Sequence, residues 1–171
     1  IIQQHEFFNK IFPHPGATLR ITTVLNTDGE ATVRAATLRI GRSNKESLSK
    51  HVQSNSAVKI AIDIKNGNLF DTGYMPDWSS IKSHPDTGVS FEGLTVPAFR
   101  EACTEVENLH RNYPFVQCIG WDVSINDNGQ VEIMEWNARH NDIKFSEAMY
   151  GPCFIDMLGR ATGELINRSK S

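Results

Sequence analysis

Residues 120–137 decide how the chain is understood, and they run Gly120-Trp-Asp-Val-Ser-Ile-Asn-Asp-Asn-Gly-Gln-Val-Glu-Ile-Met-Glu-Trp-Asn137. The Asn128-Gly129 pair favours a two-residue type I′ turn, because both central positions of that turn need a positive φ. Such a turn makes the stretch a β-hairpin and places Asp122 directly opposite Glu135. We expect the chemistry of the chain to be organised around this pair.

The two faces of the predicted hairpin differ in character. Side chains alternate along a strand, so Asn137 shares the face of Glu135, and its partner Gly120 leaves room beside it. The other face carries an apolar set of Trp121, Val123, Met134 and Trp136. Two adjacent carboxylates repel unless a proton or cation joins them, and carboxylate and amide oxygens suit Mg²⁺. Asp122, Glu135 and Asn137 therefore form a candidate metal site, although solvated polar positions on a half-exposed hairpin are the alternative.

A second hairpin is predicted for residues 18–25 and 31–40 around Asp28-Gly29, another type I′ signal. Its apolar face carries Leu19, Ile21, Leu25, Ala36 and Leu38. Arg20 and Arg39 become diagonal neighbours on the polar face, where two like charges favour an anion between them. That anion is a phosphate in the functional interpretation. In the structural interpretation the arginines pair with Glu30, Asp122 or Glu135.

The order Asp122, turn, Glu135-x-Asn137 resembles the metal-binding end of the ATP-grasp ligases. More of the chain is similar to the sugar-transfer-associated branch of that superfamily. The matching pieces are Gln4-His5, Thr18-Leu19-Arg20, Leu38-Arg39, His84-Pro85-Asp86-Thr87-Gly88, Val96-Pro97 and Gly120-Trp121-Asp122. Two places depart from that pattern: residues 51–57 lack its Asp-Asn and Gly-Gly, and residues 138–142 replace the small residues that usually follow the metal-binding Asn.

The resemblance implies an α+β fold in which residues 1–171 form one ATP-grasp C-terminal lobe. We expect a mostly antiparallel β-sheet built from successive hairpins, with flanking helices. The chain opens at Ile1 without an initiating Met, so we expect a piece of a longer protein whose N-terminal lobe is absent. The implied cofactors are ATP and Mg²⁺, with Mn²⁺ as a substitute ion.

The same resemblance implies a ligase that joins a carboxylate to an amine or thiol through an acyl phosphate, in cell-surface polysaccharide or related biosynthesis. Arg39 and Arg20 would then be catalytic and phosphate-binding. The remaining implied roles are cofactor binding by Gln3, Gln4 and His5, and substrate binding by His84 and by the residues after the last metal ligand, Arg139, His140 and Asn141. For each of these residues an ordinary polar or loop position is the alternative.

The composition limits the other classes of function. A 171-residue chain that is 39% hydrophobic, with a net charge of −3, does not indicate a nucleic-acid binder. No apolar run approaches the ~18 residues of a membrane span. Cys103, Cys118 and Cys153 show no pairing pattern, which is typical of a reducing compartment and predicts a cytoplasmic location.

Histidine spacings typical of zinc sites, nucleophile motifs and Walker loops are absent from the sequence. The partners we expect are ATP and a small-molecule carboxylate, and the oligomeric state is left open, a homo-oligomer included.

Other elements follow from periodicity and turn residues. We expect helices over 2–11 and 97–112, a hairpin of strands 58–64 and 69–74 turning at Asn66-Gly67, a polar segment over 43–55, and a long loop over 75–93. A helix is also expected from about Phe145, interrupted at Gly151-Pro152 and resumed over 154–166.

Two further functions stay open beside the ligase. One is a non-catalytic domain for nucleotide sensing or protein interaction that retains the sheet. The other, less favoured, is an acid/base pair for glycoside processing, because adjacent cross-strand carboxylates with Cβ atoms ~5 Å apart leave little space for a sugar.

Overall fold

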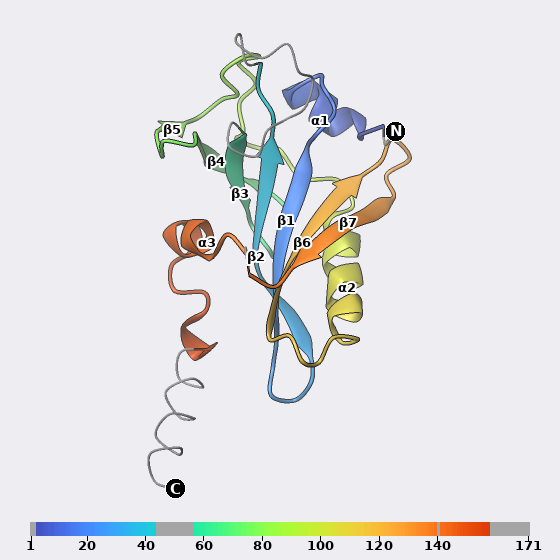
Figure 1. The fold of residues 1–171 in the computed structure, drawn as a ribbon. Coiled ribbons are helices and arrows are strands. Elements are labelled where there is room, and N and C mark those ends of the chain that lie inside the picture. Colours follow the sequence, from blue (N-terminus) through green and yellow to red (C-terminus); the bar gives the residue numbers. More distant parts are fainter. Residues whose placement is uncertain (1–2, 44–56, 140, 158–171) are drawn as a thin grey trace, which may run out of the picture.

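One antiparallel sheet of seven strands forms the centre of the computed structural model, which describes residues 3–43, 57–139 and 141–157 (Figure 1). The strands lie in the order β5-β4-β3-β2-β1-β6-β7, and all neighbours are antiparallel. The elements are α1 (Glu6–Ile11), β1 (Thr18–Leu25), β2 (Ala31–Ile40), β3 (Val58–Ile62), β4 (Leu69–Tyr74), β5 (Ser80–Ile81), α2 (Phe99–His110), β6 (Cys118–Ile125), β7 (Val131–Asn137) and α3 (Ile143–Tyr150). The predicted α+β class with successive hairpins is confirmed.

The turns of the two main hairpins differ from the prediction. Asn126 N donates to Gln130 O at 3.0 Å, and Asn26 N donates to Glu30 O at 2.7 Å, so each loop holds three residues rather than two. Gly129 and Gly29 have φ of 76° and 85°, whereas the residue before each lies outside the left-handed region. The predicted type I′ turns are therefore wrong. A single left-handed glycine at the end of a three-residue loop replaces them.

A β-bulge in each hairpin compensates for the longer loop. Between the Thr22–Ala35 and Thr23–Val33 pairs, Arg34 is the extra residue, and between the Asp122–Glu135 and Val123–Ile133 pairs it is Met134. Each bulge restores the register that a two-residue turn would have produced. Beyond the bulge the predicted pairs Asp122–Glu135, Trp121–Trp136 and Gly120–Asn137 are all present.

Met134 is the residue that the prediction misplaced. We expected it opposite Val123 on the apolar face, but Ile133 takes that position and Met134 is 52% exposed. The physical reason is the bulge, which removes Met134 from the alternation of its strand.

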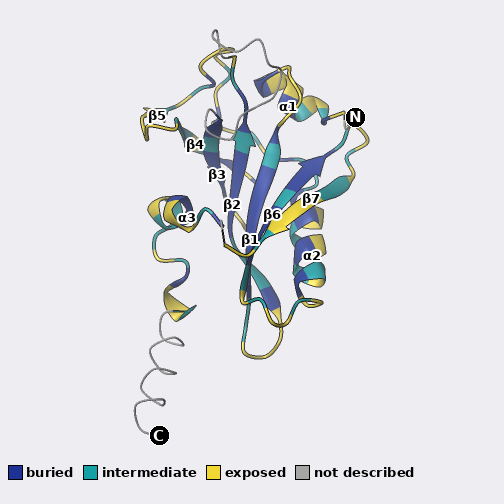
Figure 2. Ribbon diagram, viewed as in Figure 1, coloured by how far each residue is buried: buried dark blue, intermediate teal, exposed yellow. Residues whose placement is uncertain are grey.

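The buried core lies on one face of the sheet. Leu19, Ile21, Ala36 and Leu38 are fully buried there, as predicted, while Leu25 is half-buried. Helix α2 covers this face with an apolar stripe (Phe99, Ala102, Val106), and α1 adds Phe8 and Ile11 to the same cluster. Figure 2 shows the contrast between buried β1 and edge strand β7, much of which is exposed.

Helix α3 attaches to the opposite face through two aromatic side chains. Phe145 is buried against Tyr74 and Trp78, with Lys59 Nζ 5.4 Å from its ring centre. The Tyr150 hydroxyl lies where β2 and β3 separate. It accepts the amides of Ala36 (3.3 Å) and Ile62 (3.0 Å), and its single proton can be donated to the carbonyl of either residue.

The remaining expectations differ mainly at element ends. The first helix begins at Glu6 rather than residue 2, because His5 caps it by accepting the Phe7 amide. Strand β3 ends at Ile62, two residues before the predicted end. Nearly all of the polar segment over 43–55 and most of the helix over 154–166 lie outside the described residues. Within the described part of the chain, no helix is both long and apolar enough to cross a membrane.

Candidate functional site

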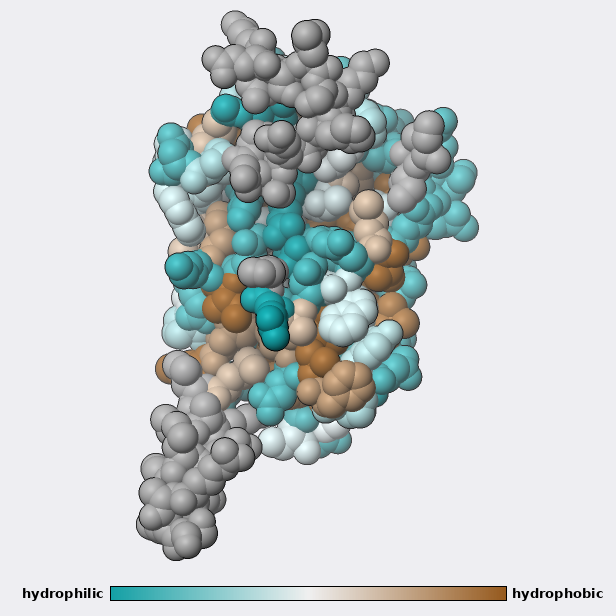
Figure 3. Space-filling view, in the orientation of Figure 1, coloured by the Kyte–Doolittle hydropathy of each residue, from teal (hydrophilic) through white to brown (hydrophobic). Residues whose placement is uncertain are grey.

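A row of charged side chains crosses the sheet on the face opposite the core. Strand register creates it: Glu135 on β7 pairs with Asp122 on β6, which pairs with Arg20 on β1. Further along, Arg39 on β2 pairs with Lys59 on β3. Arg20 and Arg39 pair with Thr37 and Thr18, respectively, so they are diagonal neighbours as predicted. Figure 3 shows hydrophilic side chains gathered over the middle of this face.

Arg20 and Asp122 form a nearly buried, two-pronged ion pair. Arg20 Nε donates to Asp122 Oδ1 and Arg20 Nη2 donates to Oδ2, both at 2.7 Å. Their side chains are only 5% and 13% exposed. Two parallel hydrogen bonds to one carboxylate form a strong and directional guanidinium contact. The anion between the two arginines is thus a carboxylate of the chain itself, one of the partners that the structural interpretation named.

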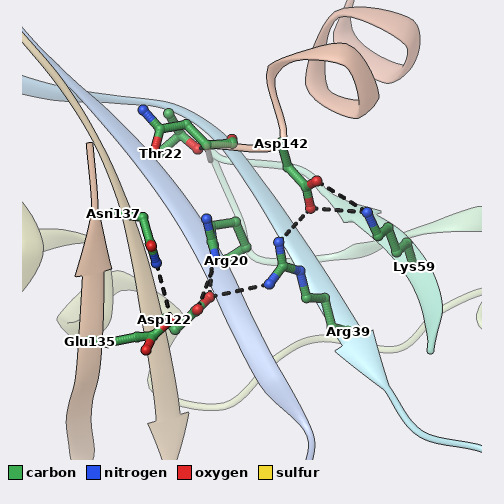
Figure 4. Close-up of polar contacts among 9 residues, drawn as sticks. Arg20, Thr22, Arg39, Lys59, Asp122, Glu135, Asn137 and Asp142 are labelled. Carbon is green, nitrogen blue, oxygen red and sulfur yellow. Dashed lines mark hydrogen bonds and ion pairs between the residues drawn. The ribbon is translucent and has the colours of Figure 1, made fainter. Parts of the chain in front are cut away.

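Arg39 joins this pair to a second carboxylate (Figure 4). Arg39 Nη1 lies 3.4 Å from Asp122 Oδ1, while Nη2 donates to Asp142 Oδ2 at 2.5 Å. Lys59 Nζ donates to both oxygens of Asp142 at 3.1 Å. Burial by itself would raise the pKa of Asp142, but the hydrogen bonds and charges of Arg39 and Lys59 outweigh it, so the net pKa is lowered.

Asp142 reaches this position through an unusual backbone. It is the residue before α3, with φ of 56° and ψ of 28°, which is left-handed and uncommon outside glycine. An aspartate at a helix N-cap usually accepts an amide of the first turn. Asp142 makes no such bond. Its carboxylate is committed to Arg39 and Lys59 instead of to its own helix.

Glu135 and Asn137 lie at the open end of the row. Asn137 Nδ2 donates to Glu135 Oε1 at 3.0 Å, and the Glu135 side chain is exposed. Hydrogen bonding from Asn137 contributes most to lowering the pKa of Glu135, which keeps the carboxylate ionised. Among the described residues no cluster of three or more His, Cys, Asp and Glu side chains is placed to hold a metal. The predicted ligands are not a cluster of that kind, because only two of them are carboxylates and the third is the amide of Asn137.

The three predicted metal ligands do share one face and adjoining strands. Their oxygens are the type that Mg²⁺ prefers, and a carboxylate has about four acceptor positions. Arg20 uses one on each Asp122 oxygen and Arg39 Nη1 lies 3.4 Å from Oδ1, so the remaining acceptor capacity is mainly on Oδ2. The donor set therefore fits a hard divalent cation, provided that Asp122 is shared with its arginine.

Gly120 is needed beside this set. A Cβ there would lie 2.8 Å from Arg20 Nη1 and 2.9 Å from Asn141 Oδ1. The room predicted next to Asn137 is thus filled by Arg20 and by Asn141, whose side chain also donates to Cys118 O at 3.2 Å.

The row lines an open pocket of about 740 Å³. Its walls are Arg20, Arg39, Lys59, Asp122, Glu135, Asn137, Arg139, Asn141, Asp142, Ile143 and Lys144. The pocket brings together both predicted arginines, the predicted metal ligands and the exposed Arg139. It is large enough for a small-molecule ligand.

Of the other predicted site residues, those that the structure describes do not line this pocket. The Gln4 side chain is buried and binds the backbone of the 12–17 loop. It donates to His14 O and accepts the amides of Gly16 and Ala17. Gln3 is exposed, and its carbonyl accepts the Asp127 amide.

The three histidines of the prediction differ among themselves. His5 caps α1. His84 is fully buried, stacks on Phe12 and lies 2.7 Å from Gly41 O through Nε2. His140 lies outside the described residues.

The sequence interpretation missed Lys59 and Asp142. Lys59 had a usable signal, since it interrupts the apolar series Val58, Ile60 and Ile62 and so belongs on the polar face of β3. Asp142 directly precedes a helical run, a position that predicts a cap rather than an ion pair across the sheet.

Fold and site together define an α+β lobe with a charged pocket on the outer face of an antiparallel sheet. Residues 1–161 match the family model for sugar-transfer associated ATP-grasp proteins, so the chain belongs to that family. No curated protein and no solved structure matches the chain.

Proposed function

We propose that the chain forms the metal- and phosphate-binding lobe of an ATP-dependent ligase that activates a small carboxylate. The observation that carries the proposal is the row Glu135, Asp122, Arg20 and Arg39, which lines one pocket with acidic oxygens at one end and guanidinium groups at the other. Membership of the ATP-grasp family supports it, since the family implies the use of ATP and Mg²⁺.

Asp122, Glu135 and Asn137 are the residues proposed to hold Mg²⁺, with Mn²⁺ able to replace it. When bound, the ion neutralises phosphate charge and helps to align the transfer. Arg20 holds the Asp122 carboxylate in a fixed orientation through two hydrogen bonds. The hydrogen bond from Asn137 does the same for Glu135.

Arg39 is proposed to stabilise the negative charge that develops on the transferred phosphoryl group, because preorganised cations lower the energy of such charge without reorientation. The substrate carboxylate oxygen attacks the γ-phosphorus of ATP and ADP leaves. An amine or thiol then attacks the acyl carbon, loses its proton and displaces phosphate. Arg139, exposed at the pocket wall, is proposed to meet the substrate. The family description supports a setting in sugar transfer, such as cell-surface polysaccharide biosynthesis.

Mn²⁺ binding measured by electron paramagnetic resonance, with and without ATP, tests the metal assignment. We expect Glu135→Gln and Asp122→Asn to weaken Mn²⁺ binding by about tenfold or more, because each removes an anionic ligand. Both should also abolish Mg²⁺-dependent ADP release wherever the unsubstituted protein shows it.

Glu132→Gln is the matched control. Glu132 lies on the same strand, pairs with Ser124 and is outside the pocket. It should bind Mn²⁺ as the unsubstituted chain does. Unchanged Mn²⁺ binding in both site variants would remove the metal assignment.

A nucleotide-sensing or protein-interaction domain is the second candidate function. The specific observation in its favour is that Asp122 and Asp142 are already paired with cations of the chain itself. Calorimetry with MgATP separates the two, followed by an assay for ADP release. Binding without turnover in every form of the protein favours the sensing domain.

A further inference from the structure

Arg39 and Lys59 lie side by side at the end of the pocket away from Glu135. They are direct partners on β2 and β3, and both line the cavity. Two adjacent cations on a sheet repel unless an anion lies between them. Asp142 supplies that anion and touches both.

Three features indicate that Asp142 fills a place suited to another oxyanion. Its backbone adopts the left-handed conformation, its helix lacks a side-chain cap, and its carboxylate bridges the two cations within the pocket wall. A carboxylate that only served its own helix would cap it. Here local backbone preference is given up for the contact across the sheet.

Arg39 also retains unused donor capacity. Its Nε is buried and has no hydrogen-bond partner in the described part of the chain. A guanidinium offers five N–H donors, and the contacts to Asp122 and Asp142 do not exhaust them. A phosphoryl group, which has more acceptor oxygens than a carboxylate, would use these donors more fully, whereas an external carboxylate would take over the contacts of Asp142.

We propose that Arg39 and Lys59 form an oxyanion subsite, and that Asp142 is an internal stand-in which the ligand displaces. The ligand group is a carboxylate or a phosphoryl group. The identity of the ligand rests on the proposed function: in the ligase it would be the substrate carboxylate or the acyl phosphate formed from it. Lys59 then becomes a ligand-binding residue at the same site as Arg39.

Displacement is feasible because of how Asp142 is held. Its side chain is 23% exposed and that of Lys59 is 29% exposed, so solvent and ligand reach the pair from the pocket. The segment that carries Asp142 is fixed behind it by Phe145 and Tyr150. Asp142 can therefore leave the cations while α3 stays on the sheet.

The test removes the internal carboxylate and measures external ones. Asp142→Asn and Asp142→Gly both suit a φ of 56°, since Asn tolerates and Gly favours the left-handed region. The probes are sodium acetate and inorganic phosphate, added to isotope-labelled protein without metal or nucleotide, at constant ionic strength, and followed by NMR. The spectra also report whether each variant remains folded.

We expect at least one probe to bind each Asp142 variant about tenfold more tightly than the unsubstituted chain, because the internal competitor no longer occupies the subsite. A larger gain for acetate identifies a carboxylate subsite, and a larger gain for phosphate identifies a phosphoryl subsite. Adding Lys59→Gln to Asp142→Asn should abolish the gain.

Lys144→Gln is the matched control for charge. Lys144 lines the same pocket and no described contact joins it to Asp142, so Asp142→Asn combined with Lys144→Gln should keep the gain. The subsite is overturned if neither folded Asp142 variant binds a probe more tightly than the unsubstituted chain. It is also overturned if the gain in affinity survives Lys59→Gln or disappears with Lys144→Gln. Because metal and nucleotide are absent, this result is independent of the Mn²⁺ experiment on Glu135 and Asp122.

Discussion

The two ends of the charged row are built in different ways. At the Asp122 end, Arg20, Asp122 and Glu135 lie on three adjoining strands, and the hydrogen-bond register of the sheet alone brings them together. At the Asp142 end, Arg39 and Lys59 also come from strands, but Asp142 is delivered by the segment before α3. The first end is part of the sheet, and the second depends on a helix that docks on it.

This difference separates what is rigid from what can move. The Arg20–Asp122 pair is nearly buried and lies on strands β1 and β6, each of which has a neighbouring strand on both sides. The side chains that contact Asp142 are more exposed. The helix that follows Asp142 is attached to the sheet by Phe145 and Tyr150. We expect substitutions at the Asp122 end to affect global stability and those at the Asp142 end to act more locally.

The largest expected effect comes from breaking the Asp122 end with Arg20→Met. The Asp122 side chain is only 13% exposed, and the change removes the guanidinium that contacts both of its oxygens. Removing one member of a nearly buried ion pair should lower the free energy of unfolding by roughly 3 kcal/mol. Urea denaturation followed by circular dichroism measures it.

The double variant Arg20→Met with Asp122→Leu is the control for that experiment. It removes both charges, so it should recover a large part of the lost stability. A double variant no more stable than Arg20→Met would mean that the loss arises from packing rather than from an unpaired carboxylate.

A smaller effect is expected from detaching the Asp142 end with Tyr150→Phe. The hydroxyl accepts the amides of Ala36 and Ile62, so its removal leaves backbone groups unsatisfied at a cost of about 1–2 kcal/mol. Hydrogen exchange should accelerate at those two amides. Unchanged exchange there would show that α3 is held by Phe145 alone.

The smallest effect concerns the acid response of Asp142. The pKa of Asp142 in the folded chain lies below the ordinary 3.8. Its ion pairs therefore stabilise the fold fully above pH 3.8, and this stabilisation is lost as the pH falls through the lowered pKa of the folded chain. The advantage of the unsubstituted chain over Asp142→Asn should therefore be constant near neutral pH and shrink as the pH falls below 3.8. Denaturant unfolding of both proteins across this range measures it. An advantage that grows on acidification would contradict the lowered pKa.

The pairing at the Asp122 end was predictable because it needs only alternation and hairpin register. Asp122 does face Glu135, and the apolar positions Leu19 and Leu38 do pair in the core. The turn geometry was not predictable in the same way. A three-residue loop with a bulge and a two-residue loop without one produce the same pairs beyond the bulge, so the pattern of faces far from the turn cannot distinguish them.

The Asp142 end was missed for a different reason. Strand β3 follows residues 44–56, a connection too long for a hairpin rule, so nothing local aligns Lys59 with Arg39. The left-handed backbone of Asp142 depends on where α3 docks, which is a tertiary property. For Gln4, the sequence could not show that its side chain would be used by the 12–17 loop.

The bulges at Arg34 and Met134 have a consequence for how such lobes can change length. Each extra residue lies between the turn of its hairpin and the end of the hairpin that carries the charged row, so it acts as a one-residue spacer. Excision of Met134 would leave a continuous ladder with Asp122 still facing Glu135. An insertion between Glu135 and Asn137 would instead move Asn137 away from its partner Gly120. Natural variants of this lobe should therefore tolerate gaps at the spacer while keeping the segment after it constant in length.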